Sequence, residues 1–255
     1  MPRYALCVEY DGGGFVGWQM QDDGPSIQGV MEEAARRLAL GAAPVIAAAG
    51  RTDAGVHAEA QVVQLDLDRA MPPDKLRDAL NYHLRPHAVA VRQAAVAPEG
   101  WQARFSAIGR AYRYRILNRP ARPALDAGRV WHVPLRLDAE AMHAAARPLL
   151  GRHDFTSFRA AACQAASPVR TLDRLDVMRA GEEIVVAAEA RSFLHHQVRN
   201  LVGTLKLVGE GRWPVARVAE ALAARSRAAA GPTAPPQGLC LIAVRYPPAL
   251  DPFAT

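Results

Sequence analysis

The chain has 255 residues, half of them hydrophobic and 22% charged. This balance excludes an intrinsically disordered chain, and the length suits one large domain or two of modest size. The formal net charge of +6 favours a polyanionic partner, because a basic surface most often neutralises phosphates.

The sequence has no signal for membrane insertion or export. No apolar run is long enough to span a bilayer, and the first residues lack the apolar core of a signal peptide. We therefore expect a cytoplasmic protein without a membrane partner. Cys7, Cys163 and Cys240 are far apart, which predicts reduced thiols rather than disulfides or a zinc site.

The N-terminal half shows strand and helix signals in the order β-α-β-β-α-β. Ser26 is the expected N-cap of the first helix and Asp74 that of the second. The predicted elements are a strand at 4–10, a helix from 27, strands at 45–49 and 61–67, a helix at 74–82 and a strand at 87–96. This order is typical of a ferredoxin-like unit, in which both helices cover one face of an antiparallel sheet.

The C-terminal half loosely repeats this order. Its predicted elements are a strand at 111–117, a helix at 139–150, strands at 172–178 and 184–189, helices at 193–208 and 215–224, and a strand at 239–244. Residues 225–237 are expected to form a mobile surface loop. We predict an α+β fold of two ferredoxin-like halves, residues 1–105 and 106–255. Their antiparallel sheets are expected to join into one extended sheet flanked by helices, with an active-site cleft between the halves.

A polar stretch, Gly-Arg-Thr-Asp-Ala-Gly-Val-His-Ala at 50–58, lies between two apolar runs. Its two glycines permit a sharp backbone path, as in a loop that aims side chains. Asp53 is the candidate nucleophile or base, and it needs a nearby cation to stay ionised in a cleft. His57 could pair with an acid for hydrolysis, but no serine or cysteine has a nucleophile context, which favours a loop-stabilising role. The alternative is an ordinary solvated connection between strands.

Arginines alternate with tyrosines at 110–115, Arg-Ala-Tyr-Arg-Tyr-Arg. One face of the predicted strand carries Arg113 and Arg115, and the other carries Tyr112 and Tyr114. Strands that bind RNA use this pattern, because bases stack on rings and guanidinium groups meet phosphates. The alternative is a strand with two core tyrosines and a solvated arginine face.

Two further polar stretches follow. Gly-Arg-His-Asp-Phe-Thr-Ser-Phe-Arg at 151–159 is either a substrate-binding loop or a packing turn with two core phenylalanines. Residues 193–203 are expected on an amphipathic helix, where a partly buried Arg199 needs an anion. His195 and His196 would point about 100° apart on that helix, which disfavours a shared metal ion.

Taken together, these stretches resemble the tRNA pseudouridine synthase A family over essentially the whole chain. The matching motifs, in chain order, are YDGGGFVGWQ at 10–19, SIQG at 26–29, GRTDAGVHA at 50–58, RFSA and RAYRY within 104–114, HDFTSFR at 153–159, FLHHQVRN at 193–200 and QGLCLIAVRYP at 237–247.

The resemblance implies isomerisation of uridine to pseudouridine at positions 38, 39 and 40 of the tRNA anticodon stem-loop. It implies that Asp53 is the catalytic aspartate, that Tyr112 stacks on the target uracil and that Arg199 is the counter-ion of the aspartate. It further implies a homodimer that binds tRNA across both subunits, and neither metal nor cofactor. The candidate substrate-binding residues are Arg51, which would displace the nucleotide, His57, Tyr112, Phe155 and Leu239, an apolar wall.

Two other functions remain compatible with parts of the sequence. A non-catalytic RNA-binding protein could use two such halves with aromatic strands, but it has no use for a carboxylate such as Asp53 facing phosphate. A hydrolase of a phosphorylated metabolite could use Asp53 and His57, but the chain lacks metal-ligand spacing.

Overall fold

The computed structural model describes residues 1–254, which form two compact units. Unit 1 comprises Met1–Arg110 together with the residues from Leu241 onward, and unit 2 comprises Ala111–Cys240. Both units contain helices and antiparallel strands, which confirms the predicted α+β class. Within the described part of the chain, we find no helix that combines the length and the apolar character needed to cross a membrane.

Unit 1 contains the predicted order β-α-β-β-α-β. Its elements are β1 (Arg3–Tyr10), α1 (Ile27–Arg36), β2 (Val45–Ala48), β3 (His57–Asp66), α2 (Pro73–Leu84) and β4 (Val89–Val96). β1 lies between β3 and β4, and β3 also pairs with β2 and with β10 (Leu239–Arg245). The pairings of β1 with β3 and β4 are antiparallel, with Leu6 opposite Val63 and Ala94.

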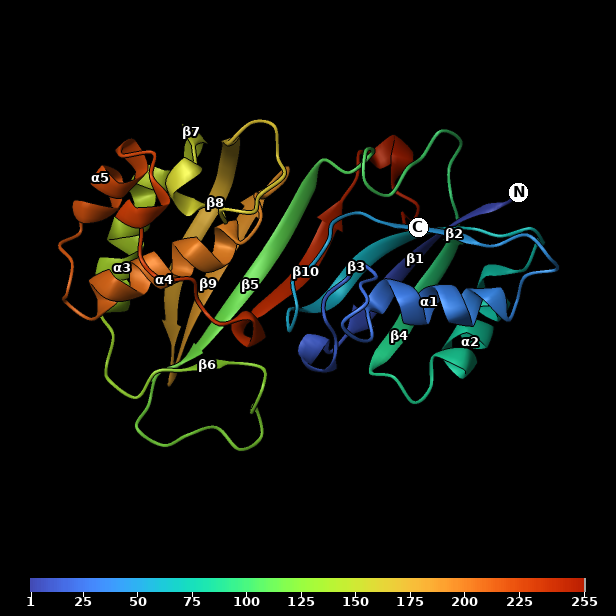
Figure 1. Ribbon diagram of the computed structural model, residues 1–255, viewed down its shortest axis with the longest axis horizontal. Coiled ribbons are helices and arrows are strands. Elements are labelled where there is room, and N and C mark those ends of the chain that lie inside the picture. The colour runs from blue at the N-terminus through green and yellow to red at the C-terminus, as the bar shows by residue number, and fades with distance from the viewer. Residues whose placement is uncertain (255) are drawn as a thin grey trace. The chain divides into compact units, whose positions relative to one another are not determined.

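The two helices of unit 1 pack side by side against its strands (Figure 1). β1 buries alternate residues, Tyr4, Leu6 and Val8, while Met31 of α1 and Leu80 of α2 are also fully buried. Burying a side chain of this size contributes about 1.5–3 kcal/mol, so this contact layer stabilises the unit.

The helix starts follow local capping chemistry in one case and not in the other. The Ser26 hydroxyl accepts a hydrogen bond from the Gly29 N–H at 3.1 Å, which confirms the predicted cap. The predicted Asp74 cap is wrong, because α2 begins at Pro73, Pro72 occupies the N-cap position and Asp74 lies in the first turn. Proline suits the first helical position, since it has no N–H that needs an acceptor there.

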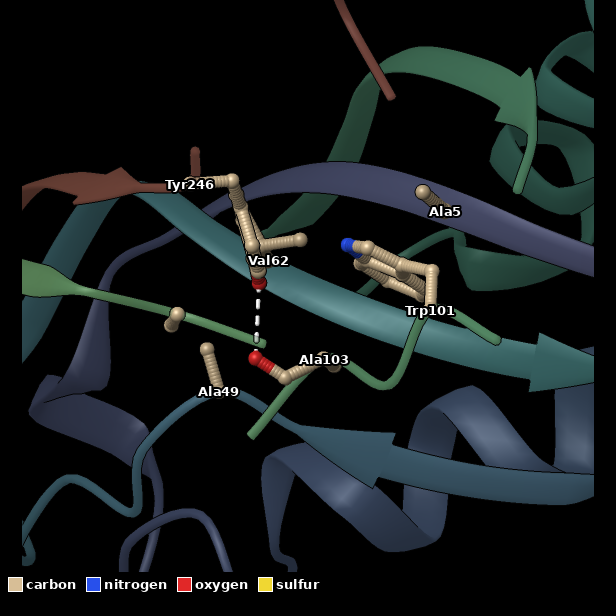
Figure 2. Close-up of a cluster of buried hydrophobic side chains, with 7 residues drawn as sticks. Ala5, Ala49, Val62, Trp101, Ala103 and Tyr246 are labelled. Atoms are coloured by element: carbon tan, nitrogen blue, oxygen red, sulfur yellow. Dashed lines mark hydrogen bonds between the residues drawn. The ribbon is translucent and has the colours of Figure 1, made fainter. Parts of the chain in front are cut away.

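The C-terminal residues belong to unit 1 rather than to a C-terminal half. Trp101 and Tyr246 lie in one buried cluster with their ring centroids 5.5 Å apart, and the Tyr246 hydroxyl donates to the Ala103 carbonyl at 2.7 Å (Figure 2). The Ile108 N–H also donates to the Arg245 carbonyl. The predicted division at residues 105 and 106 therefore differs from the observed one, because these long-range contacts return the end of the chain to the first unit.

Unit 2 follows the predicted pattern with two additional short strands. Its elements are β5 (Gly109–Leu117), β6 (Trp131–His132), α3 (Ala139–Ala146), β7 (Gly151–Asp154), β8 (Val169–Ala180), β9 (Glu183–Ala190), α4 (Gln197–Gly209) and α5 (Arg217–Ala223). The strand order is β5-β9-β8-β7, and the short β6 pairs in parallel with β5. α3 packs on β8 and on α4 (Figure 1).

The helix predicted from residue 193 begins four residues later, at Gln197. His196 has φ +61°, a left-handed conformation that cannot lie inside an α-helix. The Leu194 N–H instead donates to the Gln197 side chain at 2.8 Å, which closes a turn before the helix. His195 and His196 therefore do not point about 100° apart on a helix, as was predicted; their ring centroids lie 4.0 Å apart in this turn.

The segment 225–237, expected as a mobile surface loop, is packed against α4. Gly231 and Ala234 are buried, and the Gly231 N–H donates to the Thr204 hydroxyl at 2.9 Å. Gly203 permits this approach, because a Cβ there would lie 1.8 Å from the Pro232 carbonyl oxygen. The alanines and prolines that suggested a loop thus cover a helix.

Candidate active site

Asp53 lies in a tight turn that we call the aspartate loop (residues 50–56). The Val56 N–H donates to the Asp53 carbonyl at 3.1 Å, and Gly55 has φ +75°. A turn of this kind needs positive φ at its third position, which glycine adopts without strain. Asp53 is half-buried and Arg51 is exposed, so the loop presents both side chains.

The glycine-rich segment after β1, residues 12–18, is in direct contact with the backbone of the aspartate loop. The Trp18 N–H donates to the Thr52 carbonyl at 3.0 Å. A Cβ on Gly17 would lie 3.0 Å from that same carbonyl oxygen, and a Cβ on Gly12 would lie 2.1 Å from the Val56 oxygen. Gly12 and Gly17 therefore permit close approach of the two backbones.

The same segment is fixed to the first turn of α1. The Ile27 N–H donates to the Gly17 carbonyl at 3.1 Å, and the Gln28 N–H donates to the Trp18 carbonyl at 2.9 Å. Both bonds use N–H groups that have no partner inside the helix. The segment that contains Gly17 and Trp18 therefore links the aspartate loop to α1 through backbone hydrogen bonds.

His57 fastens the glycine turn to the start of β3. Its ring is buried, and its Nδ1 accepts a hydrogen bond from the Gly12 N–H at 3.0 Å. Asp11 Oδ1 lies 3.1 Å from the same nitrogen, but a backbone N–H can only donate, so the Nδ1 lone pair faces Gly12. This geometry favours the loop-stabilising role of His57 over a hydrolytic Asp-His pair.

Arg110 supports the strand that leads into the aspartate loop. Its side chain is 9% exposed, and its guanidinium donates to three backbone carbonyls. These are Ala49 at 2.7 Å, Arg104 at 2.9 Å and Ala107 at 3.3 Å. From the sequence, Arg110 appeared only as part of an alternating pattern, and no local signal reveals that its partners are backbone carbonyls.

The two tyrosines of β5 have different environments. Tyr112 is half-buried, and its ring meets Phe193 edge to face with centroids 5.2 Å apart. Tyr114 is fully buried and its hydroxyl donates to the Pro235 carbonyl at 2.7 Å. Burial raises the pKa of Tyr114, although the charge of Arg199 acts in the opposite direction. Only Tyr112 therefore has ring surface available for a ligand, and Phe193 is a supporting residue that the sequence pattern did not single out.

The expected solvated or phosphate-binding arginine face of β5 is wrong for Arg115. Its guanidinium binds Glu183 through two hydrogen bonds, at 2.6 and 3.0 Å, and Asp126 through a third, at 3.1 Å. These partners raise the pKa of Arg115, led by the hydrogen bonds to Glu183. Arg115 therefore has a structural role within unit 2.

Arg199 lies in the first turn of α4 and is held by the packed segment 225–237. Its Nε donates to the Ala234 carbonyl at 2.8 Å, and the Ala234 N–H donates back to the Arg199 carbonyl at 3.0 Å. This exchange uses one nitrogen of the guanidinium and orients the remaining N–H groups. An oriented guanidinium is suited to binding a carboxylate or a phosphate.

Leu239 and Phe155, both candidate substrate contacts, are buried. Leu239 is 5% exposed and follows Gly238, whose hydrogen lies against the Tyr114 ring, since a Cβ there would be 2.6 Å away. Phe155 is 0% exposed and packs edge to face against Phe158 at 6.2 Å. Core packing is therefore the role that the burial of Phe155 supports, and its contact with substrate stays a prediction.

The candidate residues are divided between the units. Arg51, Asp53 and His57 belong to unit 1, whereas the others belong to unit 2: Tyr112, Phe155, Arg199 and Leu239. Cys7, Cys163 and Cys240 are free cysteines in the part of the chain that the structure describes, and each is half-buried.

Comparison with known proteins gives consistent matches along the chain. The family model described as tRNA pseudouridine synthase matches residues 6–106 and 145–247, ranges that contain Asp53 and Arg199 but not Tyr112. A protein of Acidiphilium cryptum named tRNA pseudouridine synthase A is 68% identical over 254 residues, which covers 99% of both chains. A relative of that name from Paramagnetospirillum magneticum is 61% identical over 246 residues, 96% of both chains. One from Rhodospirillum centenum is 62% identical over 240 residues, 94% of this chain and 97% of the relative.

Proposed function

The chain belongs to the tRNA pseudouridine synthase family, and from this premise we propose that Asp53 is the group that starts the isomerisation of uridine in tRNA. The targets are positions 38, 39 and 40 of the anticodon stem-loop. The observation that carries the proposal is the aspartate loop itself: a half-buried carboxylate on a turn whose backbone is hydrogen-bonded by Trp18 and closely approached by Gly12 and Gly17. A catalytic group must be held close to its productive geometry, and this loop meets that need.

The reaction needs no external group donor, because all atoms stay within one nucleotide. The bond between N1 of the uracil and C1′ of the ribose breaks, the base turns while it is held, and C5 bonds to C1′. The proton lost from C5 is balanced by a proton gained at N1. Asp53 attacks C1′ or C6, or removes a sugar proton, and each of these routes begins with the ionised carboxylate. We therefore propose no metal and no cofactor.

Arg199 is proposed to keep this carboxylate ionised. An opposite charge at ion-pair distance offsets the desolvation that raises the pKa of an acid in a cleft. The Ala234 carbonyl orients the Arg199 guanidinium, which supports this role. A charge-reversing or charge-removing change at Arg199 should therefore slow the reaction while leaving the fold of unit 2 intact.

The target nucleotide must leave the helical stack, which costs a few kcal/mol. Stacking of the uracil on Tyr112 returns about 1–3 kcal/mol of that cost. Arg51, which is exposed on the aspartate loop, is proposed to occupy the place of the displaced nucleotide. Leu239 is proposed as the apolar wall of the uracil pocket, beside the segment that Tyr114 holds.

The test is conversion of uridine in a tRNA transcript by wild type and by Asp53→Asn, read by chemical labelling of pseudouridine. We expect product from wild type and none from the variant, with tRNA binding retained. Pseudouridine formation by Asp53→Asn would refute the assignment of Asp53. A non-catalytic RNA-binding protein, the alternative reading of the sequence, would bind the transcript and leave every uridine unlabelled.

Partners and location follow from the same proposal. The enzyme is proposed to act in the cytoplasm as a homodimer, with arginines of the basic chain contacting tRNA phosphates. Binding through phosphates releases counterions, so tRNA affinity should fall steeply as salt rises. Affinity that is indifferent to ionic strength would contradict the phosphate contacts, and sedimentation of the free enzyme would test the dimer.

A further inference from the structure

Three polar side chains meet behind the aspartate loop, inside unit 1. Gln61 of β3 donates from its Nε2 to the Gly50 carbonyl at 2.7 Å and to the Tyr10 hydroxyl at 3.4 Å. The Tyr10 hydroxyl lies 2.8 Å from the Thr52 hydroxyl. Either of these two hydroxyl groups can be the donor in this hydrogen bond. These hydrogen bonds contact Gly50 and Thr52, the first and the last of the three residues that precede Asp53.

All three side chains are removed from water. Gln61 is 0% exposed, Tyr10 4% and Thr52 7%. The Gly50 carbonyl faces the amide nitrogen of Gln61, so the amide oxygen points away, and that buried oxygen has no hydrogen-bond partner among residues 1–254. A buried acceptor without a partner lowers stability, and such exceptions tend to mark functional sites. The buried amide oxygen therefore offsets part of the stability that the Gln61 hydrogen bond to Gly50 contributes.

Thr52 is held from two sides. Its backbone carbonyl accepts from the Trp18 N–H at 3.0 Å, while its side chain is bound by Tyr10. With Thr52 fixed at both groups, the backbone that leads into Asp53 has little freedom. A change of only about 1 Å in the position of a catalytic group can slow a reaction by about 100-fold.

We infer that Tyr10, Gln61 and Thr52 are positioning residues, which act through the backbone of the aspartate loop to hold the Asp53 carboxylate in its productive geometry. The inference rests on the proposed role of Asp53. It assigns to the buried hydrogen-bonded set an effect on the rate of the chemical step rather than on tRNA binding or on the folding of the sheet.

The chain offers matched controls on the same two strands. Tyr4 of β1 is also a buried tyrosine, and its hydroxyl is bound to the Met71 N–H at 2.7 Å, away from the aspartate loop. Gln64 of β3 is a buried glutamine that binds Asp66 at 3.1 Å. Removing these groups tests the loss of a buried polar contact without touching the loop.

The experiment compares Tyr10→Phe, Thr52→Val and Gln61→Met with Tyr4→Phe and Gln64→Met, and measures kcat, KM for a tRNA transcript and Tm for each variant. For the first three we expect kcat to fall about 10- to 100-fold with KM changed less than about threefold. The two controls should lower Tm and leave kcat within about twofold. Thr52→Ser, which restores the hydroxyl, should recover most of kcat, and Tyr10→Phe with Thr52→Val should be no slower than the slower single variant.

The outcomes separate this inference from the proposed function. If Asp53→Asn is inactive while Tyr10→Phe and Thr52→Val match the controls in kcat, the positioning inference is overturned and the role of Asp53 stands. If Asp53→Asn makes pseudouridine, the proposed role of Asp53 is refuted, and the positioning inference, which rests on it, is refuted as well. A fall in kcat that tracks the fall in Tm across all five variants would assign the three side chains to stability alone and would also overturn the inference.

Discussion

The Arg110 guanidinium donates a 2.7 Å hydrogen bond to the carbonyl of Ala49, the residue that precedes the aspartate loop. These residues are 61 positions apart in sequence, and the arginine is buried. Ala49 also lies in the cluster around Trp101 and Tyr246, so its side chain is held by apolar contacts and its carbonyl by a cation (Figure 2). The base of the loop is thus anchored in the core of unit 1.

Arg110→Lys should destabilise the protein. A lysine ammonium cannot serve three separate carbonyls in the geometry of the guanidinium, which leaves buried acceptors without donors. We expect the free energy of unfolding to fall by about 2 kcal/mol, measured by urea denaturation. Arg104→Lys, at an exposed position nearby, is the control and should stay within about 0.5 kcal/mol of wild type. Equal stability of the two variants would show that the Arg110 contacts contribute nothing measurable.

Gly12→Ala and Gly14→Ala should behave differently although they lie two residues apart. A Cβ at position 12 would lie 2.1 Å from the Val56 oxygen, whereas a Cβ at position 14 would have no heavy atom within 4 Å. We expect Gly12→Ala to lose about 1–3 kcal/mol of stability and most of its pseudouridine-forming activity, because the backbone of the aspartate loop must move. Gly14→Ala should resemble wild type in both measurements. If both variants are active and stable, the close contact does not constrain the loop.

Tyr112 should contribute to substrate binding through its aromatic ring. Tyr112→Phe is expected to keep wild-type tRNA affinity, whereas Tyr112→Ala should weaken the binding of the flipped uridine by about 1–3 kcal/mol, because the stacking surface is lost. Binding is measured with an inactive Asp53→Asn background, so that substrate is not consumed. Tyr82→Ala, an exposed tyrosine of α2, is the control for nonspecific effects. Loss of affinity in Tyr112→Phe would argue against stacking as the main role.

Asp68 should make the stability of unit 1 sensitive to acid. Its carboxylate accepts hydrogen bonds from the N–H groups of Leu40, Gly41 and Ala42, and these bonds hold its pKa below the ordinary value of 3.8. A carboxyl whose pKa is lowered by folding stabilises the protein above that ordinary value and stops doing so as the pH falls through the folded value. Wild type should therefore be more stable than Asp68→Asn at pH 7, and the difference in urea midpoint should shrink below about pH 4. A difference that grows in acid would contradict this assignment.

The order of elements could be predicted because its signals are local. The strand-forming apolar run at 4–10, the Ser26 cap and the turn glycine Gly55 each act within a few residues, and each was found where expected. One prediction failed because a side-chain hydrogen bond within the segment overrides its apolar pattern. The helix expected from residue 193 begins at Gln197, because the Gln197 side chain closes a turn with Leu194 and His196 adopts a left-handed conformation.

The candidate site could be predicted only in part. A polar loop with Asp53 is visible in sequence because its residues are adjacent, and the range matched by the family model includes this loop. The burial of Phe155, the pairing of Arg115 with Glu183 and the packing of residues 225–237 on α4 have no such signal. Each of these three features depends on where another element of the fold lies, and a short stretch of sequence does not reveal that position.

By itself, the sequence determined the family of the protein, the α+β class and the loop that carries Asp53, since all three rest on residue types at short spacing. Only the tertiary structure decided what holds that loop. Tyr10 reaches Thr52 across 42 residues, and Arg110 reaches Ala49 across 61. Such partners are brought together by strand pairing and core packing, and a hydrogen bond forms only when both groups arrive at the right distance and angle. The amino-acid composition around Tyr10 or Arg110 does not by itself predict which distant residue each one contacts.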